Sequence, residues 1–187
     1  MSSPGVSIDK ISVYGKKLGE FETQCPYCGG KMLVAEVEYE IPHIGRALIV
    51  SKRCGRCGYK RNDIVPLEQR RHTRRYFKVE APDDFEVKVV RSPTARIVIP
   101  ELGLELEPGI DAEMFVTNIE GVLYLFLDAL ARLKALDPQV DARSVEEELR
   151  STASQRKTGF TVVLDDVNGL SVFYSDLREP FVLVEEV

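Results

Sequence analysis

The chain has 187 residues, enough for one domain of ordinary size or two small ones. Apolar residues make up 44% and charged residues 29%, which is typical of a globular protein and excludes a wholly disordered one. No stretch approaches the roughly 18 consecutive apolar residues that a membrane span needs, and the first residues carry neither a basic flank nor an apolar signal core. We therefore expect a cytoplasmic protein with no membrane partner.

The net charge of −5 hides an uneven distribution along the chain. Residues 1–80 contain 15 Lys and Arg against 9 Asp and Glu, whereas residues 81–187 contain 10 against 21. This change of sign indicates either two surfaces with different partners or two solvated faces that happen to differ. Both interpretations stay open.

The four cysteines form two Cys-x-x-Cys pairs, Cys25 with Cys28 and Cys54 with Cys57, and glycine follows each pair. Two residues between thiolates let both sulfurs reach one ion from a tight turn, and glycine adopts backbone angles that a β-carbon forbids. Four sulfurs occupy every position of a tetrahedral zinc ion. We therefore predict one structural Zn²⁺ per chain, with a disulfide, redox or iron–sulfur role as the weaker alternative.

The 25 residues between the two pairs exceed the commonest four-cysteine zinc spacing, so this segment must fold back on itself. Residues 31–41 alternate apolar and polar side chains, residues 42–45 are typical of a turn, and residues 46–53 return as a second strand. Residues 59–65 supply a third strand. The sequence thus predicts a zinc ribbon within residues 1–68, followed by a domain boundary in a basic connector.

The second domain, residues 69–187, is predicted to be mainly β with an inserted helical hairpin at about 117–157. A capping-box pattern, Thr-Asn-Ile-Glu at 117–120, opens a mostly buried helix that ends near Leu136, and a more polar helix follows from Ser144 to about Lys157. Strand patterns lie on both sides of this hairpin, at 76–80, 85–90, 95–99, 102–107, 160–164, 170–174 and 181–184. This order favours an antiparallel β-sandwich or barrel interrupted by two helices.

The other polar residues form no catalytic pattern. His43 falls in the hairpin turn and His72 in the basic connector, and neither lies beside a nucleophile, so we expect surface histidines. The acidic runs 146–148 and 165–166 lie on a helix face and at a strand end, which favours solvated carboxylates over acid–base or metal-binding ones. No phosphate-binding loop, nucleophile elbow or dinucleotide fingerprint occurs, so we predict that the protein is not an enzyme.

Nucleic-acid binding is the competing function. Residues 46–75 contain 10 Lys and Arg against Asp63 and Glu68, with Tyr59 among them, and phosphate neutralisation requires such a patch. The acidic second domain opposes this interpretation, and the same basic face could meet an acidic protein.

Several stretches of the sequence resemble the ZPR-type zinc-finger proteins and occur in the family's order. The most specific are Ser92-Pro93-Thr94-Ala95 and Ile99-Pro100-Glu101-Leu102, because many unrelated families contain a four-cysteine ribbon. Together the matching stretches span about residues 20–175, at 25–29, 41–43, 54–63, 89–95, 99–102, 120–123 and 164–166. A chain with one such module resembles the single-module archaeal form of the family.

This resemblance implies a zinc-binding adaptor or folding chaperone for translation elongation factor one-alpha, the GTPase that delivers aminoacyl-tRNA. It also implies that the β-domain is a double-stranded β-helix with a helical hairpin. A chaperone of a multidomain GTPase needs an extended surface, so we expect contacts from the ribbon hairpin and from a groove beside the helical hairpin.

Three residues of the ribbon are candidate partner contacts. Ile44 is expected as an apolar anchor at the hairpin tip, with packing on its own β-domain as the alternative. Arg46 and Arg61 are expected to speed encounter and set orientation. Nucleic-acid binding is expected to be weak or absent.

Overall fold

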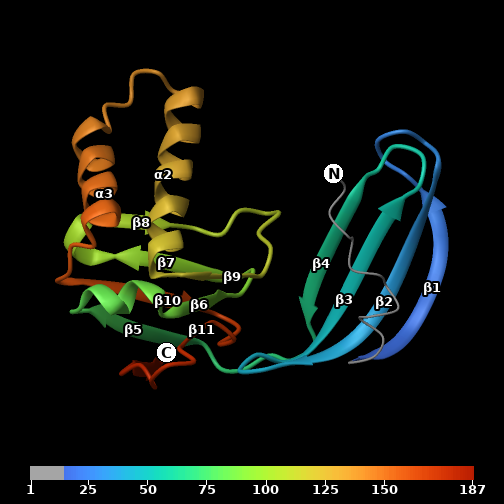
Figure 1. Ribbon diagram of the computed structural model, residues 1–187, viewed down its shortest axis with the longest axis horizontal. Coiled ribbons are helices and arrows are strands. Elements are labelled where there is room, and N and C mark those ends of the chain that lie inside the picture. The colour runs from blue at the N-terminus through green and yellow to red at the C-terminus, as the bar shows by residue number, and fades with distance from the viewer. Residues whose placement is uncertain (1–14) are drawn as a thin grey trace. The chain divides into compact units, whose positions relative to one another are not determined.

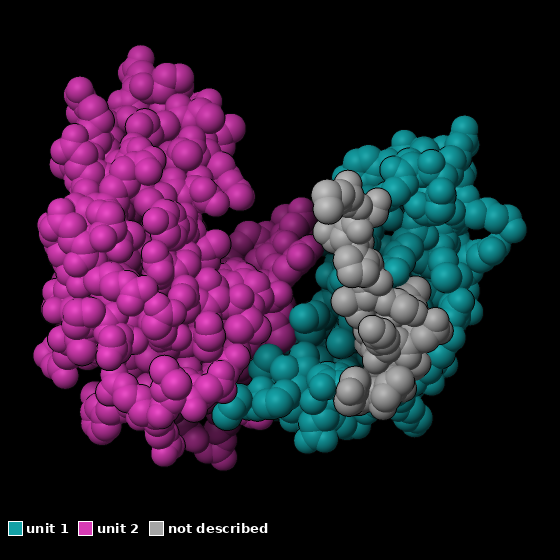
Figure 2. Space-filling model, in the orientation of Figure 1, with its two compact units in different colours: residues 1–69 teal, residues 70–187 magenta. Residues whose placement is uncertain are grey.

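The computed structural model contains two compact units, residues 1–69 and residues 70–187, which Figure 2 colours teal and magenta. The structure describes residues 15–187; the first residues, for which the sequence predicts no signal core, lie outside this part. In the described part, no helix is long and apolar enough to cross a membrane.

The first unit is an antiparallel meander of β1 (Lys16–Gln24), β2 (Lys31–Ile41), β3 (Gly45–Cys54) and β4 (Lys60–Pro66), paired in that order (Figure 1). The alternating residues 31–41 form β2, and its apolar side chains Val34 and Val37 are buried. Strand β1 is not predicted from the sequence. Its side chains are exposed or half-buried along the whole strand, so it carries no apolar alternation to reveal it.

Two antiparallel sheets form the second unit. The larger has the strand order β12-β5-β10-β7-β8 and the smaller the order β11-β6-β9 (Figure 1). The strands are β5 (Thr73–Val79), β6 (Lys88–Arg91), β7 (Ala95–Ile99), β8 (Leu104–Leu106), β9 (Phe115–Asn118), β10 (Phe160–Asp166), β11 (Val172–Tyr174) and β12 (Leu183–Glu186). The predicted fold class, mainly β with a helical hairpin beside a zinc ribbon, is confirmed.

Both sheets and both helices share one apolar core. Helix α2 (Ile119–Leu136) contributes Val122 and Phe126, and helix α3 (Arg143–Gln155) contributes Leu149. These side chains meet buried residues of the two sheets, among them Phe77, Val89, Ile97, Val162 and Phe173. The nearly continuous apolar surface of α2 explains why most of its first turns are buried, since burial of apolar area is the main driving force of folding.

The start of α2 differs from the predicted capping box. Thr117 lies in β9, where it pairs with Val89, and is not the residue that caps the helix. The N-cap is Asn118, whose Oδ1 accepts a hydrogen bond of 2.9 Å from the Gly121 N–H. The helix therefore starts one residue later than the capping-box pattern predicts.

The predicted strand at 85–90 is a short 3₁₀ helix, Pro82–Glu86, followed by the four-residue strand β6. The Asp84 carboxylate explains the change, because it accepts hydrogen bonds of 2.8 Å from the backbone N–H groups of Glu80 and Ala81. A second 3₁₀ helix, Pro100–Leu102, ends at Gly103 with a left-handed φ of +61° and shortens the strand that was predicted at 102–107.

Candidate metal centre

Two loops, the first knuckle (residues 25–30) and the second knuckle (residues 54–59), meet at one end of the ribbon. Strand β2 begins directly after the first knuckle, and β3 ends in the second. Because β2 and β3 are antiparallel with Met32 opposite Cys54, the start of one strand lies beside the end of the other. Pairing of the hairpin thus brings together cysteines that lie far apart in the sequence.

The two knuckles have the same backbone design. In the first, the Cys25 N–H donates to the Gly30 carbonyl at 2.8 Å and the Gly29 N–H donates back to Cys25 at 2.9 Å. The second repeats this pattern around Cys54, with donor–acceptor distances of 2.8 and 3.1 Å. Gly29 and Gly58 occupy equivalent left-handed positions with φ of +68° and +75°, where a β-carbon would be strained.

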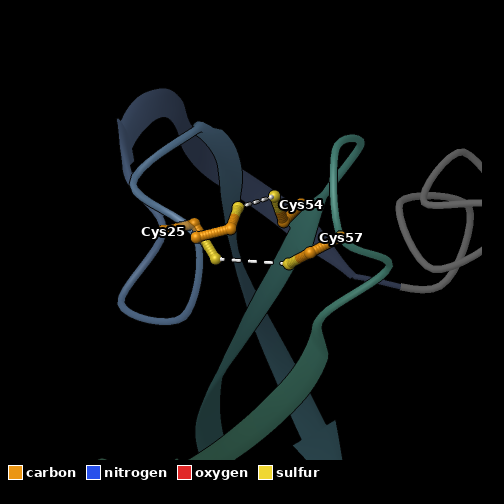
Figure 3. A group of neighbouring side chains, drawn as sticks. Cys25, Cys54 and Cys57 are labelled. Atoms are coloured by element: carbon orange, nitrogen blue, oxygen red, sulfur yellow. Dashed lines mark hydrogen bonds between the residues drawn. The ribbon is translucent and has the colours of Figure 1, made fainter.

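The four cysteine sulfurs lie within 4.8 Å of one another. Figure 3 shows Cys25, Cys54 and Cys57 facing each other from the two knuckles, and the Sγ–Sγ distances are 3.6 Å for Cys25–Cys57 and for Cys28–Cys54. A disulfide needs about 2.05 Å. A tetrahedral zinc site with Zn–S bonds of about 2.3 Å has sulfur–sulfur edges of about 3.8 Å, so the sulfurs fit Zn²⁺ closely.

Electrostatics within the cluster also favour a cation. A hydrogen bond from the backbone N–H of Cys57 lowers the pKa of Cys54 to about 6. The backbone N–H of Tyr59 lowers the pKa of Cys57, but hydrogen bonding with the neighbouring thiols and burial outweigh this effect and raise that pKa to about 12. Thiolates this close repel one another, so a dication is what allows all of them to ionise together.

The surroundings of the cluster hold the knuckles together. Met32 and Val34 form a small apolar core with the buried Cys25 and Cys54. The rings of Tyr27 and Tyr59, one from each knuckle, lie 4.9 Å apart between centroids. Zinc bound here supplies a cross-link between the knuckles and no reaction, because sulfur fills every coordination position. The site is structural.

One predicted partner contact is wrong. Ile44 is only 1% exposed and so is no exposed anchor at the hairpin tip. The turn closes on a 3.1 Å hydrogen bond from the Ile44 N–H to the Ile41 carbonyl. His43 and Gly45 flank Ile44 with left-handed φ angles of +68° and +97°, which is typical of a tight turn.

The two predicted arginines do lie at the surface. Arg46 approaches Glu38 at 3.3 Å and Glu68 at 3.5 Å, and the Nε atom of Arg61 lies 2.6 Å from Asp63. Half or so of each arginine side chain is exposed, so both remain accessible despite these ion pairs. Such pairs contribute only about 0–1 kcal/mol to stability.

The expectation of solvated carboxylates at 165–166 is also wrong. Asp165 is 7% exposed and Asp166 is fully buried. The Asp165 carboxylate lies 2.5 Å from His72 Nε2, and its other oxygen accepts hydrogen bonds from Arg74 at 3.1 Å and Arg96 at 2.6 Å. Burial alone would raise the pKa of Asp165, but these hydrogen bonds outweigh it and lower the pKa to about 2.

Asp166 joins the motif at residues 92–95 to the loop that follows β10. One carboxylate oxygen accepts hydrogen bonds of 2.8 Å from Ser92 and 2.7 Å from Thr94. The other accepts from the backbone N–H groups of Leu170 and Ser171 and from the Ser171 hydroxyl, all within 2.8 Å. The Asp166 carboxylate therefore links the two loops by hydrogen bonds, a fastener role in the β-domain. The sequence did contain a sign of this burial, because the two aspartates directly follow the apolar residues of β10.

Comparisons with known proteins agree with this architecture. Residues 18–69 match the ZPR1 zinc-finger domain, and residues 83–181 match the ZPR1 jelly-roll domain. An uncharacterized ZPR1-like protein of Methanocaldococcus jannaschii is 36% identical over 167 residues, covering 87% of this chain and 84% of that relative. The zinc finger chaperone zpr1 of Schizosaccharomyces pombe is 29% identical over 192 residues, covering 94% of this chain but 41% of the yeast protein.

Proposed function

The chain belongs to the ZPR1 family of zinc-finger proteins, and we propose that it is an adaptor or folding chaperone that binds translation elongation factor one-alpha. The observation that carries the proposal is the presence in one chain of a ribbon and a β-domain that match the family's zinc-finger and jelly-roll domains. The name of the fission-yeast relative, a zinc finger chaperone, supports a chaperone role. The elongation factor as client follows from the motif resemblance.

We propose Cys25, Cys28, Cys54 and Cys57 as the four zinc ligands. Their zinc would fix the knuckles and so the ribbon as a rigid binding surface. The proposed role involves no chemical reaction, and an elongation-factor client would place the protein in the cytoplasm.

Arg46 and Arg61 are proposed to orient the partner during encounter. Charges at the rim of an interface mainly change the association rate and its salt dependence. We expect Arg46→Glu to slow association by about tenfold while changing the dissociation rate little. Arg143→Glu, on the exposed surface of α3, is the matched control.

Calorimetry with the purified elongation factor tests the proposal. The factor should be examined in its GDP-bound, GTP-bound and nucleotide-free states against the folded, zinc-loaded protein. Binding in at least one state is expected. Absence of binding in all three would contradict the proposed client and leave the zinc site untouched.

The ion pairs of the basic segment, residues 46–75, support a protein partner over RNA. Arg74 is held by the buried Asp165, and Arg71 lies 3.0 Å from Glu186. Lys52 and Arg61 share Asp63 at 2.6 Å each. Phosphate groups would have to compete with these carboxylates for the cations.

A further inference from the structure

Two adjoining hollows beside α2 form one groove. The first has a volume of about 400 Å³ and lies between α2 and the loop from β8 to β9. The second, of about 360 Å³, follows α2 toward its C-terminus and is lined mainly by apolar side chains. Leu106 and Arg132 line both hollows, so the two adjoin each other. We call this surface the α2 groove; its apolar lining includes Leu106, Ile110, Leu125, Ala129, Leu133 and Leu136.

Several of these apolar residues are open to solvent. Ile110 is 103% exposed, Leu136 is 85% exposed, and Leu133 is 45% exposed. Large apolar side chains gathered along a concave surface commonly mark an interaction site, because their exposure to water is unfavourable.

Two arginines, Arg91 and Arg132, give the groove positive charge and hydrogen-bond donors. Arg91 is 6% exposed, and its Nε donates a 2.9 Å hydrogen bond to the Ala95 carbonyl, while its guanidinium carbon lies 5.5 Å from the centre of the Phe115 ring. These contacts fix the guanidinium in place but use one of its five N–H donors. Burial also lowers the pKa of Arg91, an effect that the charge of Asp166 partly opposes.

Neither Arg91 nor Arg132 has a carboxylate within ion-pair distance among residues 15–187. Arg132 stands exposed on α2, and Asp128, one helical turn before it, forms no ion pair with it. By contrast, five other arginines named above each pair with a carboxylate of the chain: Arg46, Arg61, Arg71, Arg74 and Arg96. Two guanidinium groups that open onto one hollow without such a partner can accept a carboxylate from elsewhere.

We propose that the α2 groove binds a peptide segment of a partner protein that presents a carboxylate beside bulky apolar side chains. The carboxylate lies at Arg91 and Arg132, and the apolar side chains occupy the hollow along Leu133 and Leu136. This inference rests on the proposed function in that the occupant is a protein, and it gives the chemistry of the segment that is recognised.

The rim of the groove argues against a polyanion as the occupant. Glu107 and Asp111 line the same hollow as Arg91 and are exposed, and Glu107 also lies 3.5 Å from Arg96. These carboxylates would repel a chain of phosphates more strongly than a single carboxylate held at the two arginines. A single acidic residue flanked by apolar ones fits both parts of the groove.

Selection from a displayed library of short random peptides tests the proposal. The zinc-loaded full chain is the bait, and enriched peptides are synthesised with a fluorescent label and measured by anisotropy. We expect sequences that contain Asp or Glu next to Leu, Ile or Phe. Arg132→Glu and, separately, Leu136→Asp should each weaken binding by about tenfold or more. Both residues are exposed, so the variants should fold.

Arg143→Glu makes the same charge change outside the groove and should leave affinity within about twofold. Enriched peptides without an acidic residue, or peptides whose binding is unchanged by Arg132→Glu, would overturn the proposal, as would a selection that enriches nothing. If such peptides bind while the elongation factor does not, the groove stands and the proposed client fails. If the factor binds equally well to wild type and Arg132→Glu and no peptide is enriched, the proposed client stands and the groove fails.

Discussion

At the scale of single residues, Asp165 and Asp166 show how one step along a strand changes the role of a side chain. Successive side chains of a strand point to opposite faces of the sheet. Asp165 therefore meets His72, Arg74 and Arg96, whereas Asp166 meets the hydroxyl groups and backbone N–H groups of two loops. Hydrogen bonds compensate the burial of both charges.

Replacement of Asp166 by asparagine should destabilise the β-domain severely. Asparagine would place an NH₂ group where one of the two carboxylate oxygens now accepts hydrogen bonds. The buried N–H or O–H groups that donate to that oxygen would then lose their acceptor. We expect a loss of about 3–5 kcal/mol in the free energy of unfolding, measured by urea denaturation. Asp128→Asn, at an exposed position on α2, should change stability by no more than about 0.5 kcal/mol. Equal effects of the two substitutions would contradict the fastener role of Asp166.

Stability should depend on the ionisation of Asp165 at acidic pH. Its pKa of about 2 in the folded protein lies below the ordinary value of about 3.9 in the unfolded chain. The unfolded state therefore binds the proton first, so the contribution is complete above about pH 4 and is lost as the pH falls toward about 2. The expected size is about 2–3 kcal/mol.

Asp165→Asn tests this pH dependence. The variant should be less stable than wild type near neutral pH, and the difference should shrink as the pH falls below about 4. Urea denaturation across this range gives the comparison, with Asp111→Asn as the exposed control. A difference between variant and wild type that is the same at every pH would show that the Asp165 charge does not matter.

At the scale of elements, the chain uses pairing and capping to set where each element starts. The β2–β3 hairpin brings the two knuckles together, and the side-chain cap of Asn118 marks the start of α2. A β-carbon at position 121 would lie 1.9 Å from the Thr117 hydroxyl, so a larger residue at this helix start would require the Thr117 side chain to rotate.

Asn118→Ala should cost about 1 kcal/mol, since it removes the acceptor for the Gly121 N–H. Thr117→Ala should cost less, because Thr117 is not the cap. The midpoints of denaturant unfolding for the two variants give the test. A larger loss of stability for Thr117→Ala would instead support the capping box that the sequence pattern predicts.

Cys57→Ser should abolish tight zinc binding and unfold the ribbon locally. Structural zinc contributes about 10–16 kcal/mol in small fingers, and serine is a poorer ligand than thiolate. The apolar cores of the two units are separate clusters, so the β-domain should stay folded. Elemental analysis and amide hydrogen exchange measure the two effects.

Tyr27→Ser is the control for this experiment, because Tyr27 lies in the first knuckle but is 77% exposed and carries no sulfur. It should retain one zinc per chain. Wild-type protein without zinc, or with iron in its place, would contradict the proposed ligand set.

At the scale of the whole molecule, the basic segment and the acidic half of the sequence meet within one fold. Arg71 of the connector pairs with Glu186, and Arg74 pairs with Asp165. Both carboxylates lie 91 residues or more further along the sequence. The opposite charges of the two halves are therefore partly an internal complementarity and do not by themselves indicate separate partners.

RNA binding should accordingly be weak and independent of sequence. Each phosphate that the protein neutralises contributes a slope of about −0.7 to −0.9 in log affinity against log salt, so any binding should decrease steeply with salt. Anisotropy with a labelled single-stranded RNA at several salt concentrations provides the measurement, and Arg71→Ala should reduce the slope. Tight, sequence-selective binding at physiological salt would instead favour the nucleic-acid alternative.

The sequence by itself determined the elements whose signals are local. The alternation of residues 31–41, the Cys-x-x-Cys pairs with their glycines, and the long apolar helix each follow from neighbouring residues, because periodicity and turn chemistry act over a few positions. The zinc site was predictable because thiolate spacing limits the possible geometry.

Only the tertiary structure decided the features that depend on distant partners. The burial of Asp166 and the placement of Arg91 and Arg132 around one hollow depend on segments that are far apart in the chain. A single sequence carries local preference but not the identity of the atoms that surround a side chain once the sheets have paired. An aspartate is solvated or buried according to whether hydrogen-bond donors from other segments reach it, and that is settled by packing.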